Sequence, residues 1–368
     1  MAIVVLSGAC VSPEVMPVPG GPGLEPPGGM EGMDEIGEDP VTRLVPVVCD
    51  TRSWSTVTPD DKDLDLAVVG TRTGASIFSV AKAGGALRGF QVDGRGEVIG
   101  DRAGTTLRAD AQYTAVSATL AAERLVVAAV ADDKVTLDLV SDNLAAHHEL
   151  GRFDGTFVGD MPVLPTRDAR VAIVGGALGV TATSFAGLFW NQSPTETLTK
   201  DAVVSMTATA YRDDAMIAWS TDARQCHLQR FSSRQESVRN FGCEGARIAA
   251  DARTNTGTLV YEDQGNVMRT DIRVGGESEL ANRVQLAELA SSPRVAFDGQ
   301  RTWISYLNVH GDLVVGFVDE HGTLISRALE GTRPQPDAYE LAFFADAMWV
   351  VSVGELGFGG QRMCVVAQ

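Results

Sequence analysis

The sequence predicts an all-β fold: a single β-propeller of about seven four-stranded blades, with the ring closed by an N-terminal strand. Three observations lead to this prediction. Short apolar runs recur at a nearly constant spacing, each run belongs to a unit of four strand-length segments, and 39 glycines are available for the turns. A chain of 368 residues is then one large repetitive domain rather than two or three ordinary ones.

Seven apolar runs set the period of the repeat. They read ASIFSV, RLVVAAV, RVAIVGG, AMIAWS, GTLVYE, RTWISYL and MWVVSV. A fixed period near 45 residues is typical of propeller blades. The centres of the runs lie 43 to 50 residues apart, near Ile77, Val127, Ile173, Ile217, Val260, Ile304 and Val350.

The sixth unit shows the internal pattern most clearly. It reads SSPRVAFDG, QRTWISYLN, GDLVVGFVD and HGTLISRAL, four strand-length segments separated by the turns DG, VHGD and DEHG. Its GFVDEHGTLIS segment is closely similar to the segment GFQVDGRGEVIG at residues 89–100. A tandem of β-sandwiches is the alternative, although sandwich strands do not normally recur with this period. Six or eight blades also remain open, because the third unit is irregular after TSFAGLFWNQSP.

The pattern VAFDGxxxWISY followed by GFVDxxGxxI, at residues 295–306 and 316–325, resembles repeats of an uncharacterised family of bacterial secreted and lipoprotein β-propellers. This resemblance implies the fold and an exported location. Its motifs carry no chemistry.

Composition limits the classes of partner. A net charge of -18 without clusters of Lys and Arg argues against nucleic acid, because phosphate backbones are held by grouped cations. No stretch reaches the eighteen or so apolar residues needed to span a bilayer. The best candidate, LAFFADAMWVVSVG, is shorter and is interrupted by Asp346.

The first forty residues differ from the rest of the chain. MAIVVLSGAC, at 1–10, resembles the end of a bacterial lipoprotein signal, which implies lipidation of Cys10; an ordinary frayed terminus is the alternative. Residues 11–40 are rich in Pro, Gly and acids, which predicts a disordered linker ahead of a propeller at 41–368. The expected location is the outer membrane, the periplasm or the cell surface, with the membrane reached only through the lipid anchor.

Four of the five cysteines remain after Cys10 is set aside, and in an exported protein they allow three disulfide connectivities. The repeat favours one of them. Cys226 begins the third strand of the fourth unit and Cys243 ends its fourth strand, so antiparallel pairing brings them together. The seventh unit stops at its third strand, QRMCVVAQ; the segment VTRLVPVVCD can supply the fourth, which pairs Cys49 with Cys364. Four free thiols in a cytosolic protein is the competing interpretation.

Ligands of propellers bind where the loops between second and third strands and between successive blades converge. In this chain those loops suggest an acidic rim with a few aromatic residues, suited to a cation, a basic peptide or a polysaccharide. The alternative is that turns are simply rich in Asp and Gly. The candidate ligand-binding residues are Trp54, Asp60, Asp61, Asp132, Asp133, Phe153, Asp154, Asp222, Asp263, His310, Arg333 and Glu355.

Motifs for metals, cofactors and catalysis are not found. DDKDLDL at 60–66 alternates oxygen ligands but has neither the glycine nor the bidentate Glu of an EF-hand loop. His147 and His148 are adjacent, so on a strand they point to opposite faces. The segment around Asp298 only faintly resembles a sialidase Asp-box, and nucleophile and phosphate-loop motifs do not occur. We therefore expect no metal, no cofactor and no catalytic residue that the sequence can name.

The function expected from the sequence is a monomeric binding or scaffolding module at the cell envelope, with an envelope protein, peptide or polysaccharide as its partner. The alternative is a propeller hydrolase or lyase acting on a surface polysaccharide, which would show a deep central pocket with two carboxylates and a basic residue. A structural subunit of an envelope complex would instead show a contiguous apolar patch on the outer blade edges.

Overall fold

The strands that the computed structural model describes form seven antiparallel sheets. The structure describes residues 43–55, 64–81, 83–121, 124–156, 163–165, 170–176, 178–186, 190–251, 253–274, 278–354 and 357–368. Within these ranges no helix is long and apolar enough to cross a membrane. The described residues belong to one unit, Thr42–Gln368. The predicted lipid acceptor Cys10 and the predicted linker at 11–40 lie outside them.

The first three sheets follow one another along the chain. Blade 1 contains β2 (Leu64–Gly70), β3 (Gly74–Ala81), β4 (Gly85–Asp93), β5 (Val98–Ile99) and β6 (Thr105–Tyr113). Blade 2 contains β7 (Ala115–Ala121), β8 (Arg124–Ala131), β9 (Lys134–Val140) and β10 (His147–Asp154). Blade 3 contains β11 (Val163–Pro165), β12 (Arg170–Gly176), β13 (Gly179–Ala186), β14 (Asn191–Gln192) and β15 (Glu196–Thr199).

The remaining four sheets complete the set. Blade 4 contains β16 (Val203–Tyr211), β17 (Asp214–Thr221), β18 (Cys226–Arg230) and β19 (Glu236–Arg239). Blade 5 contains β20 (Glu244–Asp251), β21 (Thr256–Asp263), β22 (Asn266–Val274) and β23 (Ser278–Ala287). Blade 6 contains β24 (Ser291–Phe297), β25 (Thr302–Leu307), β26 (Leu313–Val318) and β27 (Leu324–Ala328). Blade 7 contains β28 (Tyr339–Phe344), β29 (Ala347–Gly354), β30 (Gly357–Ala367) and β1 (Leu44–Ser55).

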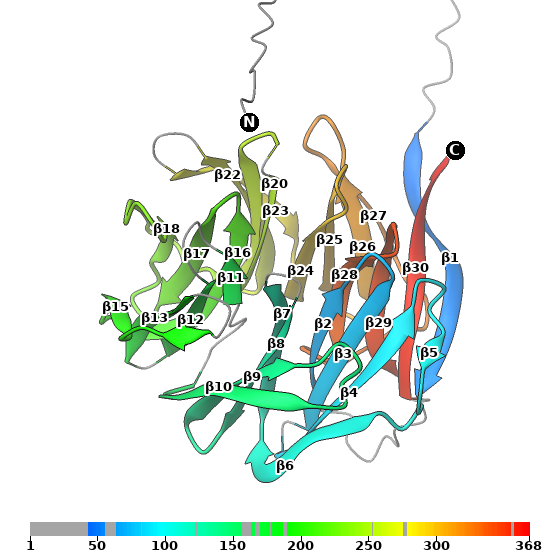
Figure 1. The fold of residues 1–368 in the computed structure, drawn as a ribbon. Helices are drawn as coiled ribbons and strands as arrows, with labels where there is room; N and C mark the ends of the chain where they lie inside the picture. The colour runs from blue at the N-terminus through cyan, green and yellow to red at the C-terminus, as the bar shows by residue number, and fades with distance from the viewer. Residues whose placement is uncertain are drawn as a thin grey trace, which may run out of the picture. The chain divides into compact units, whose positions relative to one another are not determined.

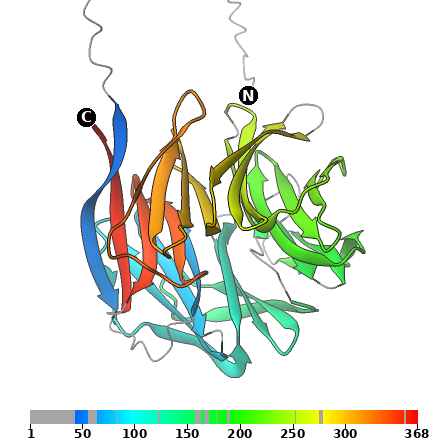
Figure 2. The ribbon, with the colours of Figure 1, turned by 180° about the vertical axis from the view of Figure 1, so that it is seen from behind.

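The first strands of the blades form the inner wall of a ring. Each contacts the first strand of the next blade, in the order β2, β7, β11, β16, β20, β24 and β28, and β28 contacts β2 again (Figures 1 and 2). The predicted all-β propeller of seven blades is therefore confirmed. A second strand lies between two sheet neighbours, and its two faces meet the adjacent blades, which is why its sequence is continuously apolar.

Burial explains the period of the repeat. The seven centres of the apolar runs all fall in second strands, β3, β8, β12, β17, β21, β25 and β29, and all seven side chains are 0% exposed. Large aromatic side chains fill the gaps between blades. Fully buried examples are Trp219, Trp303, Trp349, Tyr261 and Phe185.

The near-identical segments of blades 1 and 6 form the same turn between a third and a fourth strand. In each, the side chain of an aspartate, Asp93 or Asp319, accepts hydrogen bonds from the amides two and four residues further on. The glycine three residues after it, Gly96 or Gly322, has φ of 74° or 79°. A glycine is needed there because the left-handed conformation carries a steric cost for other residues.

Blade 7 is completed by the start of the described chain, as the sequence predicts. Strand β1 pairs antiparallel with β30, and the two lie side by side at the edge of Figure 1. The register shifts by one residue between Val48 and Asp50, which leaves Cys49 at a bulge. Cys49 and Cys364 form a disulfide with a Cα–Cα distance of 5.8 Å.

Blades 1 and 3 depart from the four-strand pattern at their outer edges. In blade 1 the third strand β4 pairs with both β5 and β6, and in blade 3 β13 pairs with both β14 and β15. The outer position is thus shared between two strands in each of these blades. This split explains why the sequence of the third unit loses its regular pattern after TSFAGLFWNQSP.

Candidate functional site

One end of the ring collects two kinds of loop from every blade. Because neighbouring strands are antiparallel, the loop between second and third strands lies at the same end as the connection from one blade to the next. We call this end the loop face. Most of the candidate residues that the structure describes lie in these loops or at the strand ends beside them.

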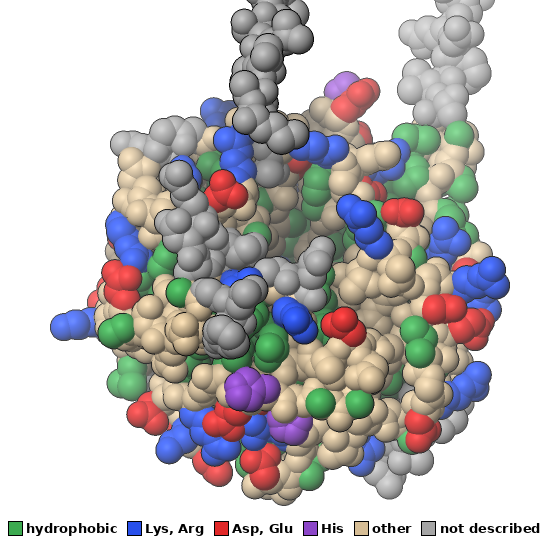
Figure 3. Space-filling model, in the orientation of Figure 1, with side chains coloured by type: hydrophobic (Ala, Val, Ile, Leu, Met, Phe, Trp, Pro, Cys, Tyr) green, Lys and Arg blue, Asp and Glu red, His purple; other side chains and the backbone are tan. Residues whose placement is uncertain are grey.

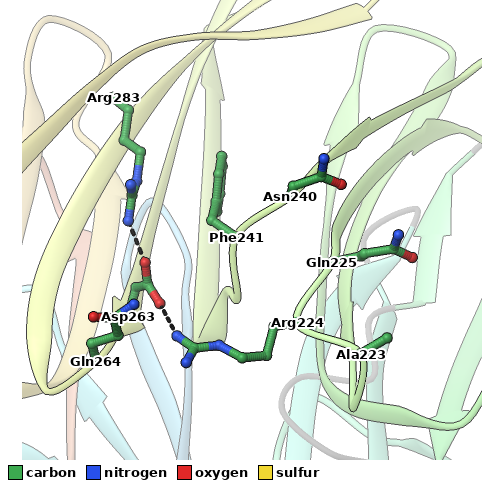
Figure 4. Close-up of a pocket in the computed structure, with 8 residues that line it drawn as sticks. All are labelled: Ala223, Arg224, Gln225, Asn240, Phe241, Asp263, Gln264 and Arg283. Atoms are coloured by element: carbon green, nitrogen blue, oxygen red, sulfur yellow. Dashed lines mark hydrogen bonds and ion pairs between the residues drawn. The ribbon is translucent and has the colours of Figure 1, made fainter.

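A cavity of about 440 Å³ opens on the loop face between blades 4 and 5, within the usual size range of small-molecule sites. Its residues come from the β17–β18 loop, the connection from β19 to β20, the end of β21 with the β21–β22 loop, and the outer strand β23. We call this cavity the blade 4–5 pocket (Figure 4). It is lined by Ala223, Arg224, Gln225, Asn240, Phe241, Asp263, Gln264 and Arg283.

Asp263 lies at the end of β21, with a side chain only 6% exposed, and it holds two arginines. Arg224 Nη2 donates to Asp263 Oδ1 at 2.5 Å, and Arg283 Nη2 donates to Oδ2. The two guanidinium groups approach the carboxylate from opposite sides (Figure 4). A buried carboxylate of this kind is stable only when it is paired and hydrogen-bonded.

Aromatic rings support the second arginine. Phe241 stacks on the buried ring of Tyr261, with centroids 5.3 Å apart and an angle of 10° between the planes. The Arg283 guanidinium lies 4.8 Å from the Phe241 centroid, and its Nε donates to the Tyr261 hydroxyl at 3.1 Å. Arg283 is therefore held by a carboxylate, a hydroxyl and an aromatic ring together.

The disulfide predicted for the fourth unit borders this pocket. Cys226 and Cys243 are bonded, with a Cα–Cα distance of 5.5 Å, and both are 0% exposed. One detail differs from the prediction, because Cys243 lies beyond the end of β19, in the connection to β20. The bridge therefore links the start of β18, directly after Gln225, to the connection that carries Phe241. Both predicted disulfides are confirmed, which indicates an oxidising, exported environment.

The candidate residues of the other blades lie apart from the pocket. Asp132 and Asp133 form the β8–β9 turn with positive φ, near Phe153 and Asp154 at the end of β10. His310 is exposed in the β25–β26 turn. Arg333 pairs with Asp312, with Nε and Oδ1 2.5 Å apart.

Of the predicted candidates, Asp263 lines the pocket, and Asp222 precedes the lining residue Ala223. Trp54 is instead part of the core: it is 1% exposed, and its Nε1 donates to the Gly96 carbonyl at 2.7 Å. Asp60, Asp61 and Glu355 lie outside the described residues.

Charges of both signs are interspersed on the face of the ring that Figure 3 shows. The pocket itself contains two arginines beside its aspartate, so it does not fit the acidic rim predicted from the sequence. In the described part of the chain, no group of three or more His, Cys, Asp or Glu side chains is placed to hold a metal ion.

A second polar group lies at the loop-face ends of the inner strands, near the ring axis. Arg294 of β24 is 3% exposed; its Nε donates to Glu340 at 2.8 Å and its Nη2 to Asp337 at 3.1 Å. Asp65 of β2 accepts a hydrogen bond from the Val116 amide at 2.7 Å. Burial raises the pKa of Asp65 to about 6, although that hydrogen bond lowers it. These contacts join neighbouring blades.

Most residues of the pocket were not among the candidates predicted from the sequence. Arg224, Gln225, Asn240 and Phe241 are close in sequence to the two cysteines of blade 4, so the predicted disulfide is the signal that could have found them. Arg283 has no comparable signal, since it lies on an outer strand of the next blade.

Comparison with known proteins identifies the architecture. No protein-family model matches the chain, and no curated protein matches it. Among solved structures, the WD40 domain of coronin from Toxoplasma gondii is similar, with a TM-score of 0.59 and 11% identity over 89% of this chain and 87% of that one. Hydrazine synthase from Kuenenia stuttgartiensis is similar with a TM-score of 0.60 and 11% identity, over 86% of this chain and 99% of that one. At this identity the likeness shows the fold alone: a β-propeller of seven blades.

Proposed function

We propose that the chain is an exported binding module that holds a saccharide in the blade 4–5 pocket. The observation that carries the proposal is the chemistry of the lining, in which six of the eight residues are Arg, Asn, Gln or Asp. Their planar side chains present donors and acceptors side by side, and neighbouring sugar hydroxyls offer both in return. A polysaccharide of the cell envelope is the natural source of such a ligand for an exported protein.

Rigidity of the lining supports binding. The Cys226–Cys243 bridge ties two of the contributing loops, and Asp263 fixes both arginines before any ligand arrives. Groups that are already in place lose little side-chain entropy on binding. The pocket is therefore suited to recognition by preformed hydrogen bonds.

Calorimetric titration of the purified protein with soluble tri-galacturonate, galactotriose and chitotriose tests this proposal. At least one should bind, and the double variant Gln225→Ala/Asn240→Ala should lose that binding while keeping its melting temperature. Arg124→Gln, an exposed change on blade 2, is the control and should bind as the wild type. Equal binding by the double variant and the wild type would move the ligand site elsewhere, and no binding of any probe would overturn the proposal.

The same mixtures test the rival function. A hydrolase would shorten the oligosaccharides, and a lyase would leave unsaturated ends that absorb ultraviolet light. Chromatography after prolonged incubation should recover each probe intact. Shortened or unsaturated products would replace the binding module with the polysaccharide hydrolase or lyase.

We also propose that lipidation of Cys10 anchors this module at the cell envelope as a monomer. The two disulfides support an exported location, and covalent lipidation gives a protein affinity for a membrane. Intact mass of the protein from the membranes of its own host should show a lipidated chain that starts at Cys10. An unmodified Cys10 in the wild type would contradict the anchor, and Cys10→Ala is the control that should leave the membrane fraction.

A further inference from the structure

The blade 4–5 pocket contains more positive charge than its buried carboxylate needs. Asp263 has one negative charge, and one arginine would neutralise it; here Arg224 and Arg283 share it. Their side chains are 53% and 40% exposed, so both guanidinium groups reach the solvent. One positive charge is left over at the cavity of a protein whose net charge is -18.

The two arginines also keep unused hydrogen-bond donors. Arg283 uses Nε on Tyr261 and Nη2 on Asp263, which leaves Nη1. Arg224 uses Nη2, which leaves Nε and Nη1. No partner among the described residues takes these donors, and Figure 4 shows both groups at the cavity that also holds Gln225 and Asn240. Arginine forks match carboxylates in geometry as well as in charge.

We infer that the ligand of this pocket is an acidic saccharide, whose carboxylate binds the free edges of Arg224 and Arg283. This inference rests on the proposed function and adds the class of sugar. The carboxylate of a uronic acid takes the two arginines, and the ring hydroxyls take the amides of Gln225 and Asn240. Neutral sugars lack this carboxylate and bind more weakly.

Two acids near the pocket bear on this inference. Glu244 is exposed. Its Oε1 and the Nε of Arg224 lie near the same point, the position of a Cβ built on Gly242, at 4.0 and 3.8 Å from it. Asp222 is exposed in the same loop as Arg224. Neither forms an ion pair with Arg224 among the described residues. Both repel an acidic ligand through solvent. Removing one of these acids should therefore raise the affinity for the acidic ligand, whereas removing Arg224 should lower it.

The experiment compares tri-galacturonate with its methyl ester, which keeps the ring and removes the charge. We expect the free acid to bind about 10- to 100-fold more tightly, since hydrogen bonds to charged groups are the stronger kind. Arg224→Gln should remove most of this preference, because it weakens the acid far more than the ester, which loses only neutral hydrogen bonds. Arg283 stays paired with Asp263 in that variant, so the fold is retained; its melting temperature checks this.

Further variants make the test independent of any single substitution. Arg224→Lys keeps the charge but not the fork, and should give intermediate affinity for the acid. Glu244→Gln should raise the affinity for the acid about two- to fivefold, as expected for an exposed charge, and leave the affinity for the ester unchanged. Arg124→Gln is the matched control at a distant arginine. Raising the salt concentration should lower the affinity for the free acid and leave that for the ester unchanged.

The outcomes separate the two proposals. If ester and acid bind equally and Arg224→Gln changes neither, the acidic class is wrong while saccharide binding stands. If only neutral sugars bind, the same conclusion holds. If no probe binds, the proposed function itself is wrong, and the inference is overturned with it.

Discussion

The two disulfides of this propeller lie in similar strand geometry but perform different tasks. Cys49–Cys364 spans 315 residues and closes the ring, while Cys226–Cys243 spans 17 residues within one blade and its exit loop. Their Cα–Cα distances are nearly equal, 5.8 and 5.5 Å. Local geometry alone therefore does not show what a bridge is for. The position of each bridge relative to the ring and to the pocket does.

Loop length makes the first bridge the larger stabiliser. By the chain-entropy estimate, closing 315 residues contributes between about 5 and 6 kcal/mol and closing 17 contributes about 3 kcal/mol. The second bridge fixes side chains at the pocket instead. We therefore expect the ring bridge to govern stability and the blade 4 bridge to govern binding.

The largest effect is expected from opening the ring. Cys49→Ala/Cys364→Ala should lower the free energy of unfolding by about 5 kcal/mol, because the covalent closure of the ring is lost and β1 is then held by noncovalent contacts alone. Urea unfolding followed by tryptophan fluorescence measures this. Ligand binding by the remaining folded protein should be unchanged, since the pocket belongs to other blades. A loss of less than about 1 kcal/mol would show that strand pairing alone closes the ring.

Removing the second bridge should reverse the pattern. Cys226→Ala/Cys243→Ala is expected to lower the free energy of unfolding by about 3 kcal/mol. It should also lower the affinity of the blade 4–5 pocket for its ligand about tenfold, because two loops of the pocket are then mobile and lose entropy on binding. Calorimetry on both double variants at equal folded fraction makes the comparison. Equal affinities in the two would contradict a role for this bridge at the pocket.

Much of the ring could be predicted from the sequence because its signals repeat. Each second strand must be apolar on both faces, so Ile77 and Val350 belong to the same pattern although they lie at opposite ends of the chain. A unit with only three strands required a fourth, and Cys49 identified which segment supplies it. The split outer edge of blade 3 was not predictable, because β14 and β15 are short and mostly exposed and their residues show no clear alternation.

Much less of the pocket could be predicted, since it depends on side chains that meet only in space. Asp263 was a candidate because acids are common in loops, but its partners Arg224 and Arg283 belong to different blades. Trp54 was a candidate because it follows a strand of the ring closure. In the structure that strand runs on through Ser55, and the indole fills the space beside Trp349, with ring centroids 6.1 Å apart.

Two glycines provide a smaller test of the same contrast. A Cβ on Gly360, in the ring-closing blade, would overlap the Trp54 ring, so Gly360→Ala should cost about 2 kcal/mol of stability. A Cβ on Gly242, at the pocket, meets no atom closer than 3.8 Å. Gly242→Ala should therefore leave the urea midpoint nearly unchanged and alter only ligand affinity. A large loss of stability in Gly242→Ala would mean that the pocket loop carries structural strain.

The smallest effect concerns pH and a contact between blades 1 and 2. Burial raises the pKa of Asp65 from 3.8 to about 6, so the folded state binds a proton more tightly than the unfolded chain between these values. Its contribution to stability is therefore present below about pH 4 and is lost as the pH rises through 6. From about pH 5 to 7 the loss is about 1 kcal/mol.

Asp65→Asn should flatten this part of the profile. The amide oxygen can still accept the hydrogen bond of the Val116 amide, so the blade contact persists while the titration is removed. Urea midpoints of the wild type and the variant are measured at several pH values. Glu262, whose pKa burial also raises, titrates in both proteins, so the difference between the two profiles reports Asp65 alone. Parallel profiles would mean that Asp65 keeps its ordinary pKa and that solvent reaches the inner ends of blades 1 and 2.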